Sequence, residues 1–190
     1  LAGTEPVDSG EISRKKNART MILPQEDVLD PEKTIEETLF QAVPEGLEPW
    51  QVDKRRQEII DVMALDDTDG KVETLSGGWR KKMALGQALF QQPDLLLMDE
   101  PTNHLDLEGI LWLEQRLQEA AFAFVLVSHD RHVLDAVAER IWRVGGGTVR
   151  TFLGNYSDFR WQVEEGSARP LEGTTAAASP DDAVPSQNGR

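Results

Sequence analysis

Two short apolar runs stand out in the pattern of hydrophobic and polar positions along the chain. LLLM at 95–98 is apolar at every position, and FAFVLV at 122–127 is a second such run. A strand that is buried on both faces has no solvent side, so it does not alternate apolar and polar residues. We therefore expect two buried strands of a parallel sheet at these positions.

Segments with helical spacing surround these runs, where apolar residues recur three or four positions apart. Pro31 suits the first turn of the earliest helix, and Ser76 is a good N-cap for the third. The predicted helices cover residues 31–43, 50–63, 77–92, 105–120 and 132–140. The alternation of strands and helices predicts an α/β fold with a parallel sheet.

The two ends of the chain have other patterns. GEISRKKNARTMIL at 10–23 predicts short strands with a turn at Gly10, and IWRV and TVRTF around Gly145–Gly147 predict a β-hairpin. Residues 166–190 are rich in Gly, Ala, Ser, Pro and Thr and have almost no large apolar side chain. Because such a segment cannot bury a core, we expect it to be disordered.

Composition excludes several classes of function. No apolar run approaches the roughly 20 residues that span a bilayer, so we expect no membrane insertion. The absence of cysteine excludes disulfides and fits a reducing cytosol. A net charge of −14 works against non-specific nucleic-acid binding. Basic clusters as short as Arg14–Lys16, Lys54–Arg56 and Arg80–Lys82 are typical of solvated faces.

Polar side chains follow both predicted strands. Asp99 and Glu100 come directly after LLLM, and Ser128, His129 and Asp130 come directly after FAFVLV. Ligands of α/β sheets bind beyond the carboxyl ends of the strands, so these groups should converge if the strands are neighbours. Two acids and an imidazole at one edge suit phosphoryl transfer, which depends on positioning and electrostatics.

The same polar residues also have structural explanations, which compete with the interpretation as a phosphoryl-transfer site. A single Asp at a strand end is commonly a turn or cap residue, and a lone His there is more often structural than catalytic. The pair Asp99-Glu100 is harder to explain in that way, because two adjacent carboxylates after a buried strand are costly to desolvate without partners. LSGGW at 75–79 adds a helix start whose free N–H groups could bind an anion.

LSGGWRKKMALGQALFQQPDLLLMDEPTNHLD at 75–106 resembles the signature motif, Walker B motif and D-loop of ATP-binding cassette (ABC) proteins. The Trp after LSGG, together with EPTNHLD and SHDR, is similar to the ABC-F class, whose members are ATPases that act on ribosomes. The resemblance implies a P-loop NTPase-like parallel sheet with a helical subdomain. It extends over residues 1–165, with the helical subdomain and signature helix within 28–92, and leaves 166–190 as a separate tail.

The resemblance assigns four residues to the chain's own ATP site. Gln25 in LPQED would be the Q-loop glutamine that senses Mg²⁺ and the attacking water. Asp99 would hold Mg²⁺ through water, and Glu100 would polarise the attacking water as general base. His129 would be the switch histidine that reaches the γ-phosphate.

A second set of residues is assigned to the contact with another cassette. Ser76, Gly77 and Gly78 would touch the γ-phosphate of ATP held by an opposing cassette, and Asp106 would belong to the D-loop between the two. The resemblance therefore implies ATP and Mg²⁺ as ligands, a second cassette as partner, the ribosome as a partner of the parent protein, and a cytoplasmic location.

The phosphate-binding loop GxxxxGK[ST] is absent from the sequence. We expect it to lie just before Leu1, so that the chain is a cassette truncated at its N-terminus and hydrolyses ATP poorly by itself. The long charged linker of the class is also absent, so we expect no strong nucleic-acid binding by this chain. Two alternatives stay open: the ATP-binding subunit of an ABC transporter, and a non-catalytic cassette remnant.

Overall fold

The structure is a computed structural model that describes residues 13, 15–25, 29–41, 43, 46–65 and 67–165. The chain divides into two compact units at Asp130, and each unit is described by itself. The predicted turn at Gly10 and the predicted disordered tail at 166–190 lie outside the described residues. Within the described ranges, no helix combines the length and apolar character needed to cross a bilayer.

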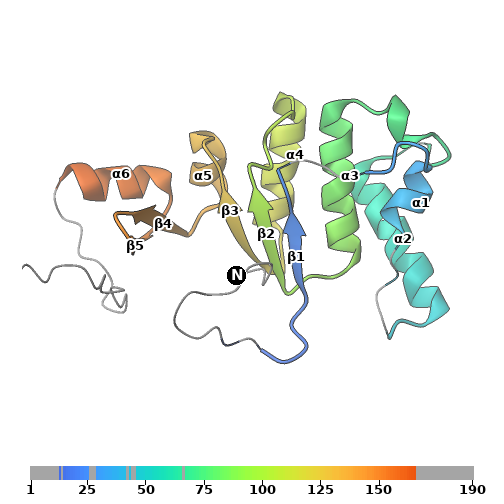
Figure 1. Cartoon of the computed structure of the whole chain (residues 1–190), viewed down its shortest axis with the longest axis horizontal. Coiled ribbons are helices and arrows are strands. Elements are labelled where there is room, and N and C mark those ends of the chain that lie inside the picture. The colour runs from blue at the N-terminus through green and yellow to red at the C-terminus, as the bar shows by residue number, and fades with distance from the viewer. Residues whose placement is uncertain are drawn as a thin grey trace, which may run out of the picture. The chain divides into compact units, whose positions relative to one another are not determined.

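The first unit contains a three-stranded parallel sheet in the order β1-β2-β3 (Figure 1). Its strands are β1 (Thr20–Leu23), β2 (Leu95–Asp99) and β3 (Ala123–Val127), and α4 (Leu107–Gln118) connects the last two. Leu23 pairs with Met98, and Met98 pairs with Leu126, so all three strands end at the same edge. The predicted parallel sheet is confirmed.

The two predicted strands differ in burial. In β2, Leu96 and Met98 are almost fully buried, as expected of a central strand. In β3, no residue is fully buried, and Val127 is 58% exposed. The prediction of a second buried strand is therefore wrong in burial, because β3 pairs on one side only within the described sheet.

Three helices gather beside β1 and share one apolar core (Figure 1). They are α1 (Ile35–Leu39), α2 (Pro49–Met63) and α3 (Gly77–Phe90), with a 3₁₀ turn at Val72–Thr74. The core consists of Ile35, Leu39, Phe40, Ile59, Met63, Val72, Met83 and Phe90. The helices pack so closely that a Cβ added at Gly86 would overlap the sulfur of Met63. This group positions α3 against the end of β1.

The first helix is shorter than predicted. Thr34 caps it: its hydroxyl accepts a hydrogen bond from the Glu37 amide at 3.1 Å, and the Glu37 carboxylate accepts one from the Thr34 amide at 2.9 Å. This capping box starts the helix at Ile35 instead of Pro31, and the helix ends at Leu39. The prediction of a helix over 31–43 is therefore wrong at both ends.

The second unit contains α5 (Arg131–Val137), β4 (Arg140–Gly145), β5 (Thr148–Leu153) and α6 (Tyr156–Glu164). The antiparallel pairing of β4 and β5 confirms the predicted hairpin. Gly146 and Gly147 have φ of 57° and 70°, the left-handed conformation that two-residue hairpin turns require. The helix predicted over 132–140 ends at Val137, and α6, which Asn155 caps, was not predicted.

Candidate functional site

The carboxyl end of β2 carries the two adjacent acids in different environments. Asp99 is exposed, whereas the Glu100 side chain is only 14% exposed. The Glu100 amide donates to the Val127 carbonyl at 2.8 Å, and Glu100 has a φ of 46°. A left-handed glutamate is uncommon, and such backbone conformations are concentrated at functional sites. The Asp99 and Glu100 side chains therefore differ in exposure to solvent, and they can take separate roles.

Glu100 meets His129 across the strand ends. The His129 amide donates to Oε2 of Glu100 at 3.3 Å, and Nε2 of the imidazole lies 3.7 Å from Oε1. The imidazole itself is 99% exposed. The predicted convergence is thus present, because β2 and β3 are neighbours and end in register. A shielded carboxylate next to an exposed imidazole can accept a proton from water on the open side.

Gln25 lies at the same edge, two residues after the end of β1. The ammonium of Lys81 in α3 donates to the carbonyl oxygens of Pro24 at 3.1 Å and Gln25 at 2.9 Å. Lys81 is 2% exposed, so the prediction that Arg80–Lys82 is a solvated face is wrong for this residue. The burial of Lys81 could have been predicted from its position in the helix, since it shares a helix face with the buried Leu85 and Ala88.

Ser76 caps α3 as predicted, its hydroxyl accepting from the Trp79 amide at 3.3 Å. The amides of Gly77 and Gly78 have no acceptor among the described residues, and Ser76 and Gly77 are exposed. Free N–H groups at the positive end of a 14-residue helix favour an anion. This end of α3 is therefore the phosphate-binding candidate of the first unit.

The two glycines of this helix start pack on the turn that follows Glu100. A Cβ at Gly78 would lie 3.2 Å from the carbonyl oxygen of His104, and one at Gly77 would lie 3.5 Å from the His104 Cβ. Asp106 then caps α4, where its Oδ1 accepts from the Gly109 amide at 2.8 Å. One carboxylate oxygen of Asp106 is thus engaged within the chain.

Lys82, the residue after Lys81, makes cation–π contacts with two tryptophans. The Lys82 ammonium lies 4.9 Å from the ring centroid of Trp79 and 5.7 Å from that of Trp112. Trp112 in α4 also donates from Nε1 to the Val62 carbonyl at 3.0 Å. These cation–π contacts connect the start of α3 to α4. Trp79 and Lys82 are three positions apart on one helix, a spacing that sequence reasoning missed, whereas Trp112 lies 30 positions further along the chain.

The donor set at the strand ends fits Mg²⁺ only together with a phosphate. No group of three or more acidic, His or Cys side chains that could hold a metal occurs in the part of the chain that the structure describes. Mg²⁺ is commonly held by one or two carboxylates, with water and substrate phosphates completing its shell. The exposed Asp99 supplies one such carboxylate, and Gln25 adds an amide at the same edge.

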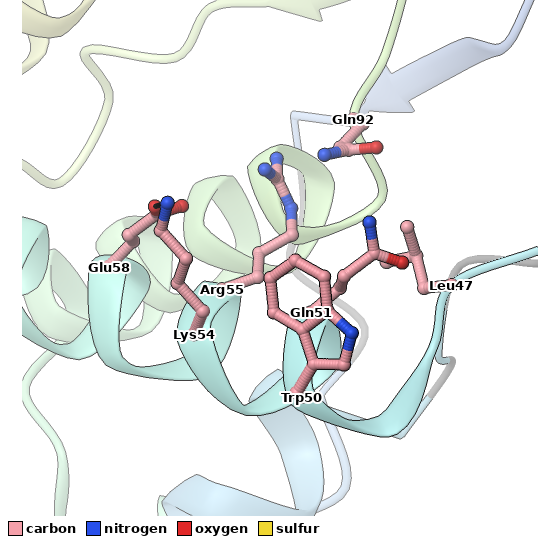
Figure 2. A pocket seen from close by; sticks show the side chains of 7 residues that line it. All are labelled: Leu47, Trp50, Gln51, Lys54, Arg55, Glu58 and Gln92. Atoms are coloured by element: carbon pink, nitrogen blue, oxygen red, sulfur yellow. Dashed lines mark ion pairs between the residues drawn. The ribbon is translucent and has the colours of Figure 1, made fainter.

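A pocket of about 200 Å³ lies away from these residues, between α2 and the segment after α3 (Figure 2). None of the predicted site residues lines it. Arg55 donates from this pocket to the carbonyls of Leu89 at 2.7 Å and Phe90 at 2.9 Å, and so caps the end of α3. Burial lowers the pKa of the Arg55 guanidinium, Glu58 raises it, and Arg19 lowers it. We assign this pocket a structural role.

The chain matches the family model described as ABC transporter over residues 1–103. It is 33% identical to ABC transporter F family member 5 of Arabidopsis thaliana, over 84% of this chain and 29% of that protein. It is 32% identical to the energy-dependent translational throttle protein EttA of Haemophilus influenzae, over 87% of this chain and 36% of that protein. It is 44% identical to EttA of Mycobacterium tuberculosis over 110 residues.

A solved structure shows the same fold. The chain is similar to cbiO1 of Clostridium perfringens, described as part of the ABC transporter complex cbiONQ, with a TM-score of 0.62. This similarity covers 77% of the chain and 61% of cbiO1 at 22% identity, which shows the fold alone. Most of the chain aligns with the Arabidopsis and Haemophilus relatives, but it spans only about a third of the length of either of them.

Proposed function

The chain belongs to the ABC transporter family and to its ABC-F class, and from this premise we propose that it supplies the water-activating half of an ATP hydrolysis site. In this proposal, residues 1–165 belong to the cassette, with the helical subdomain and signature helix within 28–92. The observation that carries the proposal is the contact of Glu100 with His129 at the carboxyl edge of a parallel sheet.

Glu100 is proposed as the general base. Its carboxylate is largely shielded from solvent, with the His129 amide holding Oε2. The opposite oxygen, Oε1, faces the imidazole and is placed to take the proton of a water molecule. His129 is exposed and can turn its imidazole towards a phosphoryl oxygen, where an N–H donor stabilises developing negative charge.

Asp99 and Gln25 are proposed to hold Mg²⁺, Asp99 through water, with the phosphates of ATP completing the shell. Asp99 is the last residue of β2 and Gln25 follows β1 by two residues, so both lie at the edge where these paired strands end. When bound, Mg²⁺ neutralises charge on the phosphates. Asp99 is the better ligand of the two because it is anionic and exposed.

The start of α3 is proposed to act on a different nucleotide. Its free amides at Gly77 and Gly78 and the Ser76 hydroxyl would contact the γ-phosphate of ATP held by a second cassette, placed head to tail. Asp106, whose Oδ2 is not engaged in the cap, would face the same interface. A second cassette is therefore the proposed partner, in the same parent protein or in a dimer.

The parent protein is proposed to couple ATP hydrolysis to translation on the ribosome, in the cytoplasm. The support is the similarity to EttA, which is described as an energy-dependent translational throttle protein, together with the extent of that similarity. The solved transporter component supports the fold only, so a transporter subunit is the weaker candidate.

A chimera tests the hydrolysis proposal. A segment that carries GxxxxGK[ST] from a relative is joined to Leu1, and ATP turnover is measured by phosphate release. We expect Glu100→Gln to lower kcat at least about 100-fold and Asp99→Asn to raise the Mg²⁺ requirement. Gln115→Ala, an exposed change on α4, is the matched control. Equal turnover in the Glu100→Gln chimera would show that Glu100 is not the base.

Association tests the partner proposal. The chain is mixed with a complete, hydrolysis-blocked ABC-F cassette, and complex formation is measured by analytical ultracentrifugation with ATP or ADP. We expect an ATP-dependent complex that Gly78→Asp weakens at least about tenfold, because the new carboxylate repels phosphate. A complex that forms equally well with ADP would contradict the head-to-tail arrangement.

A further inference from the structure

Lys81 places a charged group in the interior of the first unit. Its relative exposure is 2%, and its ammonium donates to the carbonyls of Pro24 and Gln25. The transfer of an ammonium from water into a protein interior costs several kcal/mol, so such a residue is kept only where strong hydrogen bonds offset that cost. The carbonyl contacts of Lys81 are of this kind, since bonds from a charged donor are the strong ones.

These contacts join two segments that are distant in the chain. Gln25 follows β1, and Lys81 lies in α3, 56 positions later. Lys81 is also only five residues after Ser76, the cap of the same helix. A single side chain therefore links the Gln25 backbone to the helix whose first turn presents the anion-binding amides.

The first turn of α3 is restrained by its contacts, so that a displacement of this turn would also displace Lys81. Lys82, its neighbour, lies between the rings of Trp79 and Trp112, and Gly78 packs on the carbonyl of His104. Rigid secondary-structure elements are among the carriers of coupling between distant sites, and α3 is one continuous helix from Gly77 to Phe90. A shift of the first turn would thus reach Lys81, and through it the two carbonyls.

We propose that Lys81 is a positioning residue that makes the placement of Gln25 depend on the state of the Ser76–Gly78 segment. The inference rests on the proposed function, in which Gln25 faces the chain's own nucleotide and Ser76–Gly78 face that of the partner cassette. When the nucleotide of the partner cassette contacts the first turn of α3, the placement of Gln25 at the chain's own nucleotide changes. Lys81 touches neither nucleotide.

The first test needs no substitution and no ATP. Nitrogen-15 NMR of the 190-residue chain measures how fast the Lys81 ammonium protons exchange with water, with the exposed Lys54 as internal reference. We expect exchange at least about tenfold slower at Lys81, and scalar coupling from its Nζ to the Pro24 and Gln25 carbonyl carbons. Exchange as fast as at Lys54 would overturn the proposal.

The second test measures the coupling itself. Ser76→Ala removes the cap of α3, and the shift of the Gln25 side-chain amide resonance is recorded with and without Lys81→Met. We expect Lys81→Met to reduce the Ser76→Ala effect to less than about half, because the connection is cut. Lys54→Met is the matched control and should leave the effect intact. An undiminished effect in the Lys81→Met background would overturn the proposal.

The outcomes separate the two proposals. If Lys81→Met folds and the Ser76→Ala effect is undiminished in it, the positioning role is removed and the hydrolysis proposal stands. Coupling in the chain together with an inactive chimera leaves the positioning role and removes the hydrolysis proposal. If Lys81→Met does not fold, Lys81→Gln takes its place, because it removes the charge and shortens the side chain without adding volume to a buried site, and it should reduce the coupling. An undiminished Ser76→Ala effect in a folded Lys81→Gln variant would overturn the positioning role.

Discussion

The Cβ that Gly78 lacks would lie 3.2 Å from the carbonyl oxygen of His104, whereas the one that Gly77 lacks would make an ordinary 3.5 Å contact. Both glycines are in the first turn of the same helix, so they differ mainly in this clearance. The start of α3 is thus fitted to the backbone of the turn that follows Glu100. A backbone carbonyl cannot move aside as a flexible side chain can.

This difference predicts opposite results for two alanine variants. Gly77→Ala should raise the free energy of unfolding by about 0.5 kcal/mol, since alanine is the better helix former. Gly78→Ala should bring no gain, because the tight contact with His104 offsets the same advantage. Urea denaturation of both variants measures the difference. A stabilisation by Gly78→Ala equal to that of Gly77→Ala would contradict the close packing.

Gly86→Ala should destabilise the chain although it lies within α3. The new methyl group would overlap the Met63 sulfur and lie 3.0 Å from a methyl carbon of Leu39, both in the core. Overpacking of this kind costs about 1–3 kcal/mol, more than the helix propensity returns. The urea midpoint should fall accordingly, and Gln115→Ala on an exposed face should leave it unchanged.

Arg55→Met should lower the free energy of unfolding by about 1–2 kcal/mol. It removes two charged hydrogen bonds to the last carbonyls of α3, at Leu89 and Phe90. Lys54→Met, one residue earlier on an exposed face, is the control and should change stability little. A similar loss in both variants would show that general charge, and not the cap, is responsible.

The effect of Arg55→Met should not depend on pH in the ordinary range. Burial lowers the pKa of this guanidinium in the folded state, so the folded chain binds fewer protons and stability rises with pH only near that lowered value. An arginine remains protonated from about pH 5 to about pH 9, so the difference from wild type should stay constant there. Denaturation at several pH values measures it.

The 190-residue chain should hydrolyse ATP no faster than its own Glu100→Gln variant. The sequence contains no GxxxxGK[ST], so the lysine and the amide cradle that hold the β- and γ-phosphates are not among these residues. Without a positioned phosphate, Glu100 as a general base should add little to the rate of ATP hydrolysis. A phosphate-release assay on the purified chain measures this, and turnover typical of a cassette that Glu100→Gln abolishes would refute the prediction.

Local patterns predicted the elements that local forces determine. The continuous apolar run of β2, the Ser76 cap and the glycine turn of the hairpin all follow from the chemistry of neighbouring residues. The short α1 shows where competing local signals decide. Pro31 favoured an early start, but the reciprocal bonds of Thr34 and Glu37 set the first helical residue at Ile35, four residues later.

Contacts between distant residues were not predictable in the same way. Lys81 lies within a basic cluster, so composition suggested solvent, while its place on the buried face of α3 was the weaker signal. The convergence of Glu100 with His129 was predicted only on the condition that their strands are neighbours, which the pairing of β2 with β3 satisfies. The Lys82 contact with Trp112 required the packing of α3 against α4 to be known, whereas its contact with Trp79 lies within α3.

The placement of Lys82 between Trp79 and Trp112 also provides an optical probe. Indole fluorescence depends on charge and water close to the ring, and here a single ammonium lies near two of the five tryptophans of the chain. Any event that moves the first turn of α3 away from α4 would separate that ammonium from at least one ring. The native emission spectrum therefore reports on this helix start without a label, and replacement of the other three tryptophans would isolate the signal.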